Sequence, residues 1–253
     1  MPLTTLARSV LLEARRGGLP WLAAASVMLG LALAAFLSQV ALTESLALQA
    51  ALVAAVLRAC AVFLVAAQVT ASTLREIHDK GLELMLSLPL SRSTHYLGRL
   101  LGFILCGAAL AALFAVPLLV WAKPAAVALW GVSLACEVAL VAAAALFFAM
   151  TLGQFAPAIA ATGGLYLLAR SIGAIQAIAS GPLADASPAA RIAEYAVDAV
   201  ALVLPRLDAL TRTAWLLYET PPPGVYAAAL GSALLYTLLL VAAGLFDFHR
   251  RSA

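Results

Sequence analysis

Three charged side chains lie inside long apolar stretches, where an ionised group is costly unless it is paired or hydrated. They are Arg58, Glu137 and Arg170. At 1.5 Å of helix per residue, Arg58 lies about 18 Å and Glu137 about 17 to 18 Å from the outer boundary of the predicted spans, whereas Arg170 lies closer to it. Similar depth and opposite charge predict an ion pair between Arg58 and Glu137, within one subunit or between two.

Such a pair could fix the packing of two helices, or it could provide a polar lining for a transport path. The sequence leaves both interpretations open. Arg170, being shallower, is expected to face an aqueous vestibule or anionic lipid headgroups.

Patterns for catalysis and for metal binding are missing from the sequence. It contains neither a Gly-x-Ser-x-Gly nucleophile motif nor a His-Glu-x-x-His metal motif. Cys60, Cys106 and Cys136 are spread over different apolar stretches, which favours small core residues over a soft-metal site. No Gly-x-x-x-x-Gly-Lys-Ser/Thr phosphate loop occurs, so ATP is not expected to bind this chain in that way. We expect no catalytic residue, no metal and no cofactor here.

The composition is that of a membrane protein. Hydrophobic residues make up 65% of the chain and charged residues 11%, against about 25% charged in typical soluble domains. The apolar runs are long enough to cross a bilayer and lack two-residue alternation, which favours helices over barrel strands. We predict an all-α polytopic protein with six spans, at 20–42, 46–72, 96–121, 125–150, 157–179 and 224–246. The net charge of +3 is too small to indicate a nucleic-acid partner.

The orientation follows from the basic residues, which concentrate in cytoplasmic segments of membrane proteins. With both termini in the cytoplasm, nine basic residues lie inside: Arg8, Arg15, Arg16, Arg75, Lys80, Arg92, Arg99, Arg250 and Arg251. Four lie outside: Lys123, Arg191, Arg206 and Arg212. The first apolar run is longer than a signal-peptide core, so we expect it to remain as a span.

Two segments outside the spans are expected to be helical. Residues 1–18 place apolar side chains at helical spacing, as in a helix that lies in the membrane interface. Residues 180–223 form an outer segment, with one helix opening at Ser187-Pro188 and a second at about 208–218. Asp208 and Trp215 are its candidate functional residues. Four aromatic side chains suit the outer interface: Trp121, Trp130, Trp215 and Tyr218.

A charged cytoplasmic loop, 73–95, joins the second and third spans. Within it, residues 82–88 are expected to form about two turns of apolar helix that Pro89 ends, and Ser91 is a candidate N-cap for the third span. An apolar helix exposed to the cytosol would be a liability, so it should be covered. It could lie on the lipid, or it could dock a cytosolic partner.

The stretch "LELMLSLPLSRSTHYLGRLLG" (82–102) resembles the cytoplasmic loop of ABC exporter permeases of the type-2 class, close to Gly-Thr-Leu-Glu-Leu-Leu-Leu-Ser-Leu-Pro-Val-Ser-Arg. Lys80-Gly81 replaces the Gly-Thr pair of that pattern. Gly98 and Gly102 match its Gly-Lys-Leu-Leu-Gly-like continuation and also form a small-residue pair that permits close helix approach. A weaker likeness, at 201–219, is to permeases for multicopper-enzyme and nitrous-oxide-reductase maturation.

The resemblance implies a single permease domain over residues 1–253 in a bacterial inner membrane. Two copies would form the pathway, and two copies of a separate ATPase, which binds ATP and Mg, would power it. Contact with the ATPase would fall on Leu82, Glu83, Leu84, Met85, Leu86, Ser87 and Leu88, and secondarily on Arg75, Glu76 and Asp79. The alternative is a non-transporting assembly factor that couples ATPase motion to maturation of a periplasmic copper enzyme.

Overall fold

The computed structural model describes residues 2–40, 45–79, 91–180, 188–218 and 221–250, and these residues form helices and no strands. Six of the described helices are long and apolar enough to cross a membrane. They are α2 (Leu19–Val40), α3 (Ser45–His78), α5 (Arg92–Ala115), α6 (Pro124–Leu152), α7 (Phe155–Ala179) and α10 (Pro223–Arg250). The predicted all-α polytopic membrane fold is confirmed.

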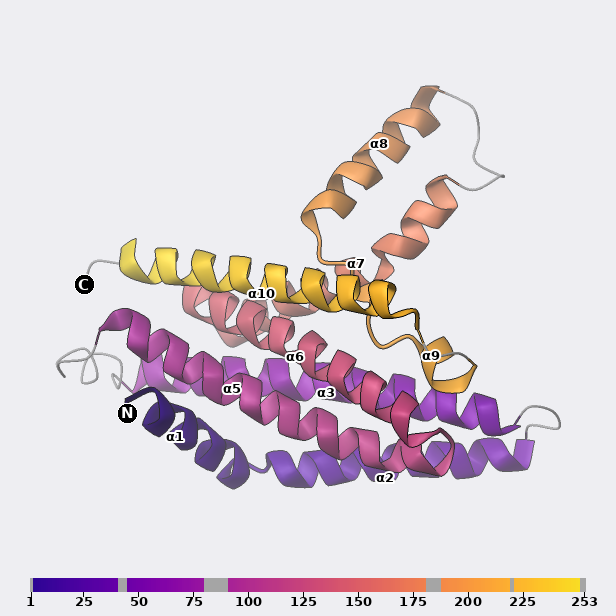
Figure 1. Cartoon of the computed structure of the whole chain (residues 1–253). Coiled ribbons are helices and arrows are strands. Elements are labelled where there is room, and N and C mark those ends of the chain that lie inside the picture. The colour runs from indigo at the N-terminus through magenta and orange to yellow at the C-terminus, as the bar shows by residue number, and fades with distance from the viewer. Residues whose placement is uncertain (1, 41–44, 80–90, 181–187, 219–220, 251–253) are drawn as a thin grey trace.

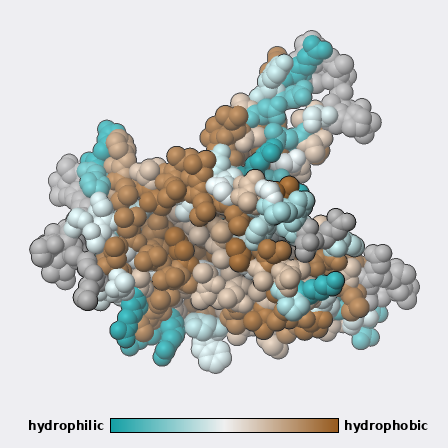
Figure 2. Space-filling model, in the orientation of Figure 1, coloured by the Kyte–Doolittle hydropathy of each residue, from teal (hydrophilic) through white to brown (hydrophobic). Residues whose placement is uncertain are grey.

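The long helices lie along a common direction and form one bundle (Figure 1). Both chain termini lie at the same end of this bundle, which we call the terminal end, and the opposite end is called the distal end. Brown, hydrophobic atoms dominate the visible flank of the bundle, whereas teal atoms gather at its ends and on a projecting hairpin (Figure 2). This distribution is the one that a bilayer around the bundle requires.

Helix α6 is the central element, because α3, α5, α7 and α10 all pack against it. It begins at Pro124, whose fixed φ suits the first turn of a helix and whose missing N–H would lack a helical partner there in any case. It ends at Gly153, which adopts a left-handed φ of 66° while its N–H donates to the carbonyl of Ala149. The predicted boundaries at Lys123-Pro124 and Gly153 are confirmed.

Helix α5 begins where the sequence predicts. The Ser91 hydroxyl accepts a hydrogen bond of 3.2 Å from the amide of Thr94 and so caps the first turn. At the distal end, Pro117 cannot continue the α-helical bonding pattern, and the chain tightens into the 3-10 helix η1 (Val116–Val120).

The N-terminal helix α1 (Pro2–Arg16) packs on the terminal half of α5. Ala7, Val10 and Ala14 are buried, and the predicted amphipathic N-terminal helix is confirmed. Gly98 and Gly102 lie at the contact: a Cβ at either position would come within 3.0 Å of α1. The close helix approach expected at these glycines is therefore real, and the helix that approaches is α1.

The segment before the last span differs in part from the prediction. Helix α8 (Pro188–Val203) begins at Pro188 as expected and, with the end of α7, projects from the bundle as a hairpin (Figure 1). The expected single helix over 208–218 is wrong. The chain instead forms the short 3-10 helix η2 (Leu207–Ala209) and the five-residue helix α9 (Thr213–Leu217). They are separated because Leu210 is extended and Thr211 adopts a positive φ of 46°.

Candidate functional site

Glu137 lies near the middle of α6 and its side chain is 0% exposed. Three groups contact its carboxylate. The Tyr166 hydroxyl donates a hydrogen bond of 2.8 Å to Oε1, and the Thr211 hydroxyl donates to Oε2. Arg170 places Nη1 3.6 Å from Oε1. Together with Arg58, these residues form what we call the intramembrane charge cluster.

The two arginines of this cluster also bind backbone carbonyls. Arg170 Nη1 donates to the carbonyls of Leu207 and Leu210, at 2.6 and 2.9 Å. Arg58 Nη1 donates to the carbonyl of Thr211, at 3.3 Å. These carbonyls belong to the irregular segment 204–212, in which Leu207, Leu210 and Thr211 are buried and Thr211 reaches Glu137. Irregular backbone at membrane depth is tolerated where protein satisfies its polar groups, and the arginines do so here.

Within the subunit, the ion-pair partner of Glu137 is Arg170 and not Arg58, so the predicted pairing is wrong for one chain. The depth estimate treated each span as straight and perpendicular to the membrane. It also left out the guanidinium reach, which lets an arginine place its charge well away from its own Cα level. Arg58 remains part of the cluster, because the residue whose carbonyl it binds, Thr211, also donates to Glu137.

Thr211 is a conformational outlier at the centre of the cluster. A β-branched residue with positive φ is strained, typically by about 1 to 3 kcal/mol. Its side chain is fully buried, its hydroxyl bonds Glu137, and its carbonyl bonds Arg58. The strain is therefore held in place by contacts from α3 and α6. Neither Thr211 nor Tyr166 was expected from the sequence, since an isolated hydroxyl carries no signal of its buried partner.

Asp208 and Trp215 make no bond to Glu137, although the Asp208 carboxylate is close enough to Arg170 to attract it electrostatically. The Asp208 carboxylate lies 3.9 Å from Arg212 Nη2, and it packs so closely on α7 that a Cβ at Gly173 would clash with it. Trp215 packs edge-to-face on Tyr226 of α10, with ring centroids 5.8 Å apart. Their geometry is that of packing residues in the outer segment.

A second polar group of residues, which we call the terminal junction, joins α1, α3 and α5. Glu76 of α3 receives the Arg99 guanidinium of α5, and its Oε1 lies 3.3 Å from His95 Nε2. Arg99 also donates to Ser72, whose hydroxyl donates to Glu13 of α1. Because His95 and Arg99 are four residues apart, they lie on one helix face and can grip one carboxylate.

The residues predicted to contact an ATPase fall into two groups. Arg75, Glu76 and Asp79 lie at the end of α3: Glu76 is the core of the terminal junction, whereas Arg75 is exposed and lies 3.7 Å from Glu13. Asp79 is exposed and its amide donates to the carbonyl of Arg75. Seven predicted residues lie outside the part of the chain that the structure describes: Leu82, Glu83, Leu84, Met85, Leu86, Ser87 and Leu88.

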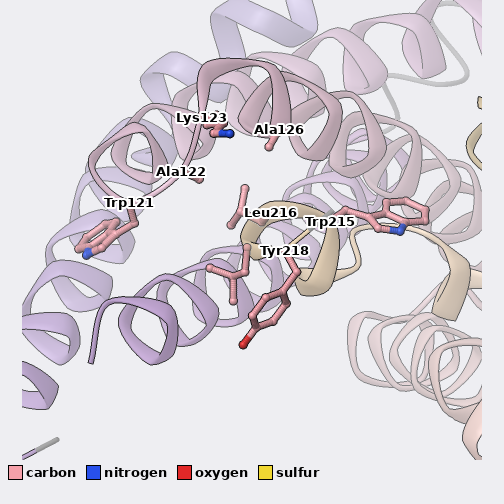
Figure 3. Close-up of a pocket in the computed structure, with 8 residues that line it drawn as sticks. Trp121, Ala122, Lys123, Ala126, Trp215, Leu216 and Tyr218 are labelled. Atoms are coloured by element: carbon pink, nitrogen blue, oxygen red, sulfur yellow. The ribbon is translucent and has the colours of Figure 1, made fainter. Parts of the chain in front are cut away.

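The distal end has a pocket of about 530 Å³ between the start of α6 and α9. Trp121, Lys123, Trp215, Leu216 and Tyr218 are among the residues that line it (Figure 3). Trp121 is fixed by a hydrogen bond of 3.1 Å from its Nε1 to Gln49 of α3. This pocket is called the distal pocket below.

Trp130 does not take the interfacial place that its position predicted, because it is only 2% exposed in the bundle core. Among the described residues, no group of three or more His, Cys, Asp or Glu side chains could hold a metal ion.

No protein-family model matches the chain, and no curated protein matches it.

Proposed function

We propose that this chain is the membrane-spanning permease subunit of an ABC exporter of the type-2 class, driven by a separate ATPase. Two copies would form the pathway, and two ATPase copies would bind ATP and Mg. The proposal rests on the 82–102 pattern together with the arrangement at its two ends. The helices that flank the loop, α3 and α5, are bonded to each other through Glu76 and Arg99.

This arrangement suits a region that transmits the movement of an ATPase to the membrane helices. A displacement of segment 80–90 by an ATPase would act on the last turn of α3 and the first two turns of α5. Because Glu76 ties these turns together, and Ser72 connects Arg99 to Glu13, the three helices would move as one unit. Packing of α1 against Gly98 and Gly102 adds a rigid contact to the same unit.

In the proposed mechanism, the intramembrane charge cluster connects the outer segment to three spans. Arg58 belongs to α3, Glu137 to α6 and Arg170 to α7. A tilt of α3 would therefore reach segment 204–212 through the bond from Arg58 to the carbonyl of Thr211. In this proposal the terminal end faces the bacterial cytoplasm and the outer segment faces the periplasm, where it would open and close the exit for an exported or flipped substrate.

Site-specific photocrosslinking in cells tests the proposal. A photoreactive amino acid at Glu83 should capture a protein that mass spectrometry identifies as carrying a phosphate loop. The same probe at Lys123, at the distal end, should not capture it. Capture of lipid alone from Glu83, with ATP hydrolysis unchanged in the membranes, would contradict the proposed docking.

A measurement of ATP hydrolysis complements the crosslinking experiment. Vesicles that contain the captured ATPase and the permease should hydrolyse ATP faster than vesicles with the ATPase alone. Arg99→Ala should remove this acceleration while the ATPase stays bound, because the terminal junction transmits force and does not provide the docking surface. An acceleration that Arg99→Ala leaves intact would remove the terminal junction from the mechanism.

A further inference from the structure

A pocket of about 470 Å³ lies at the terminal end, between α1 and the last turn of α3, and we call it the terminal pocket. Its volume is within the range of about 300 to 1,000 Å³ that is typical of ligand pockets. Because residues three and four apart share one helix face, a single flank of α1 forms one wall. The lining residues are Ser9, Leu12, Glu13, Arg16 and Gly17 from the α1 side and Arg75 from α3.

Two guanidinium groups from different helices line this pocket with a single carboxylate. That carboxylate, Glu13, is already engaged by α3: the Ser72 hydroxyl donates a hydrogen bond of 2.8 Å to Oε2, and Arg75 Nη1 lies 3.7 Å from Oε1. A guanidinium has five N–H donors, so the exposed Arg75 can hold Glu13 and a second anion at once. Arg16 is exposed and has no ion-pair partner within the described part of the chain. The pocket therefore favours an anion.

The terminal pocket differs in this respect from the distal pocket. Lys123 is the one charged residue among those that line the distal pocket, whereas the terminal pocket offers two cations from opposite walls. Planar guanidinium groups also suit the oxygens of a phosphate group better than an ammonium does, because each can donate two parallel hydrogen bonds. A phosphate group is therefore the anion that the two arginines fit best.

The surroundings of the pocket favour a phosphate that belongs to a lipid. Helix α1 exposes Leu3, Leu11 and Leu12, the last of which lines the pocket. Teal atoms over α1 lie next to the brown flank of the bundle (Figure 2). An amphipathic helix of this kind lies at the boundary between headgroups and acyl chains, and basic pockets between membrane helices bind anionic headgroups. A free phosphate would use the arginines and gain nothing from the leucines.

We propose that the terminal pocket binds the headgroup phosphate of an anionic phospholipid. Arg16 of α1 and Arg75 of α3 hold the phosphate from two sides, and Leu12 contacts the start of an acyl chain. Both oxygens of Glu13 are engaged, so the ammonium of a zwitterionic lipid gains little there. The lipid would join α1 to α3 beside the terminal junction. This inference requires only that the bundle spans a bilayer, and it is independent of the proposed function.

Native mass spectrometry of the full-length protein in detergent tests the proposal. The probes are phosphatidylglycerol and phosphatidylcholine with identical acyl chains, and phosphatidylglycerol should bind at least about 5-fold more tightly. Arg16→Gln should weaken its binding about 5-fold, since one basic residue near an anionic headgroup contributes about that factor. Arg15→Gln is the matched control, with an expected change of less than about 2-fold. It removes the same charge from the same exposed turn of α1 but does not line the pocket.

Two further measurements locate the lipid and identify the source of the phosphate. Arg75→Gln should weaken phosphatidylglycerol binding as Arg16→Gln does, because the phosphate lies between the two helices. An excess of sodium phosphate, compared with sodium chloride at the same ionic strength, should leave the lipid bound. Four results would each overturn the proposal: equal affinity for the two lipids, equal losses in Arg15→Gln and Arg16→Gln, unchanged affinity in Arg75→Gln, or displacement of the lipid by inorganic phosphate.

Discussion

Gly102 of α5 lies directly against Val10 of α1: a Cβ at position 102 would come within 2.7 Å of the Val10 Cβ and 3.0 Å of the Ala7 backbone. Backbone atoms cannot yield as the end of a flexible side chain can. The missing side chain at Gly102 is therefore what allows the N-terminal helix to rest on the third span and to bring Glu13 within reach of Ser72.

Gly102→Ala should destabilise the protein by about 1 to 3 kcal/mol, since overpacking forces the two helices apart. Gly231→Ala, in α10, is the matched control, because no atom apart from the neighbouring backbone of α10 itself lies within 4 Å of a Cβ there. Thermal unfolding in detergent, followed by size-exclusion chromatography, measures both. Equal midpoints for the two variants would contradict the close contact.

Glu137→Gln should lower stability by about 3 to 5 kcal/mol, the usual effect of removing one member of a buried ion pair. The variant leaves Arg170 without its carboxylate, with Arg58 also nearby. The double variant Glu137→Gln, Arg170→Met should recover part of the loss, because no unpaired charge of that pair remains. A double variant that loses the sum of the two single effects would show that the charges act independently.

Thr211→Val should lower stability by about 1.5 to 3 kcal/mol, because it keeps the branched shape but removes the hydrogen bond to a charged group. Thr211→Ser retains the hydroxyl and should lose only about 1 kcal/mol, the contribution of the one buried methyl group that it removes. Denaturant titration in mixed micelles measures the free energy of unfolding of both variants. If serine and valine behave alike, the hydroxyl contributes nothing.

The terminal junction offers a contrast between two arginines. Arg99→Ala should cost about 3 to 5 kcal/mol, since its guanidinium and the Glu76 carboxylate are only 11% and 12% exposed. Arg75→Ala should cost no more than about 1 kcal/mol, because its side chain is 63% exposed and its pair with Glu13 is screened by water. The losses in unfolding free energy of the two variants are compared in one detergent and at one salt concentration. This comparison tests whether burial determines how much each ion pair contributes to stability.

Elements that depend on local chain chemistry could be predicted. Lys123-Pro124 begins a span and Gly153 ends one because proline and glycine restrict or permit particular backbone angles whatever the fold. The Ser91 cap follows from the same local logic. The single helix expected at 208–218 could not be tested by local rules, because the bonds that hold Thr211 in its positive-φ conformation come from Arg58 and Glu137, which are distant in the sequence.

The sequence by itself determined that this chain is an α-helical membrane protein with six spans, because apolar length and the bonding needs of a backbone in lipid are properties of the chain alone. It also identified Arg58, Glu137 and Arg170 as charges inside long apolar helices. Only the tertiary structure decided that Glu137 pairs with Arg170 and that segment 204–212 folds in to meet them. Partners of a buried charge depend on how helices tilt and on which loop returns to the core, and neither is encoded in residue spacing.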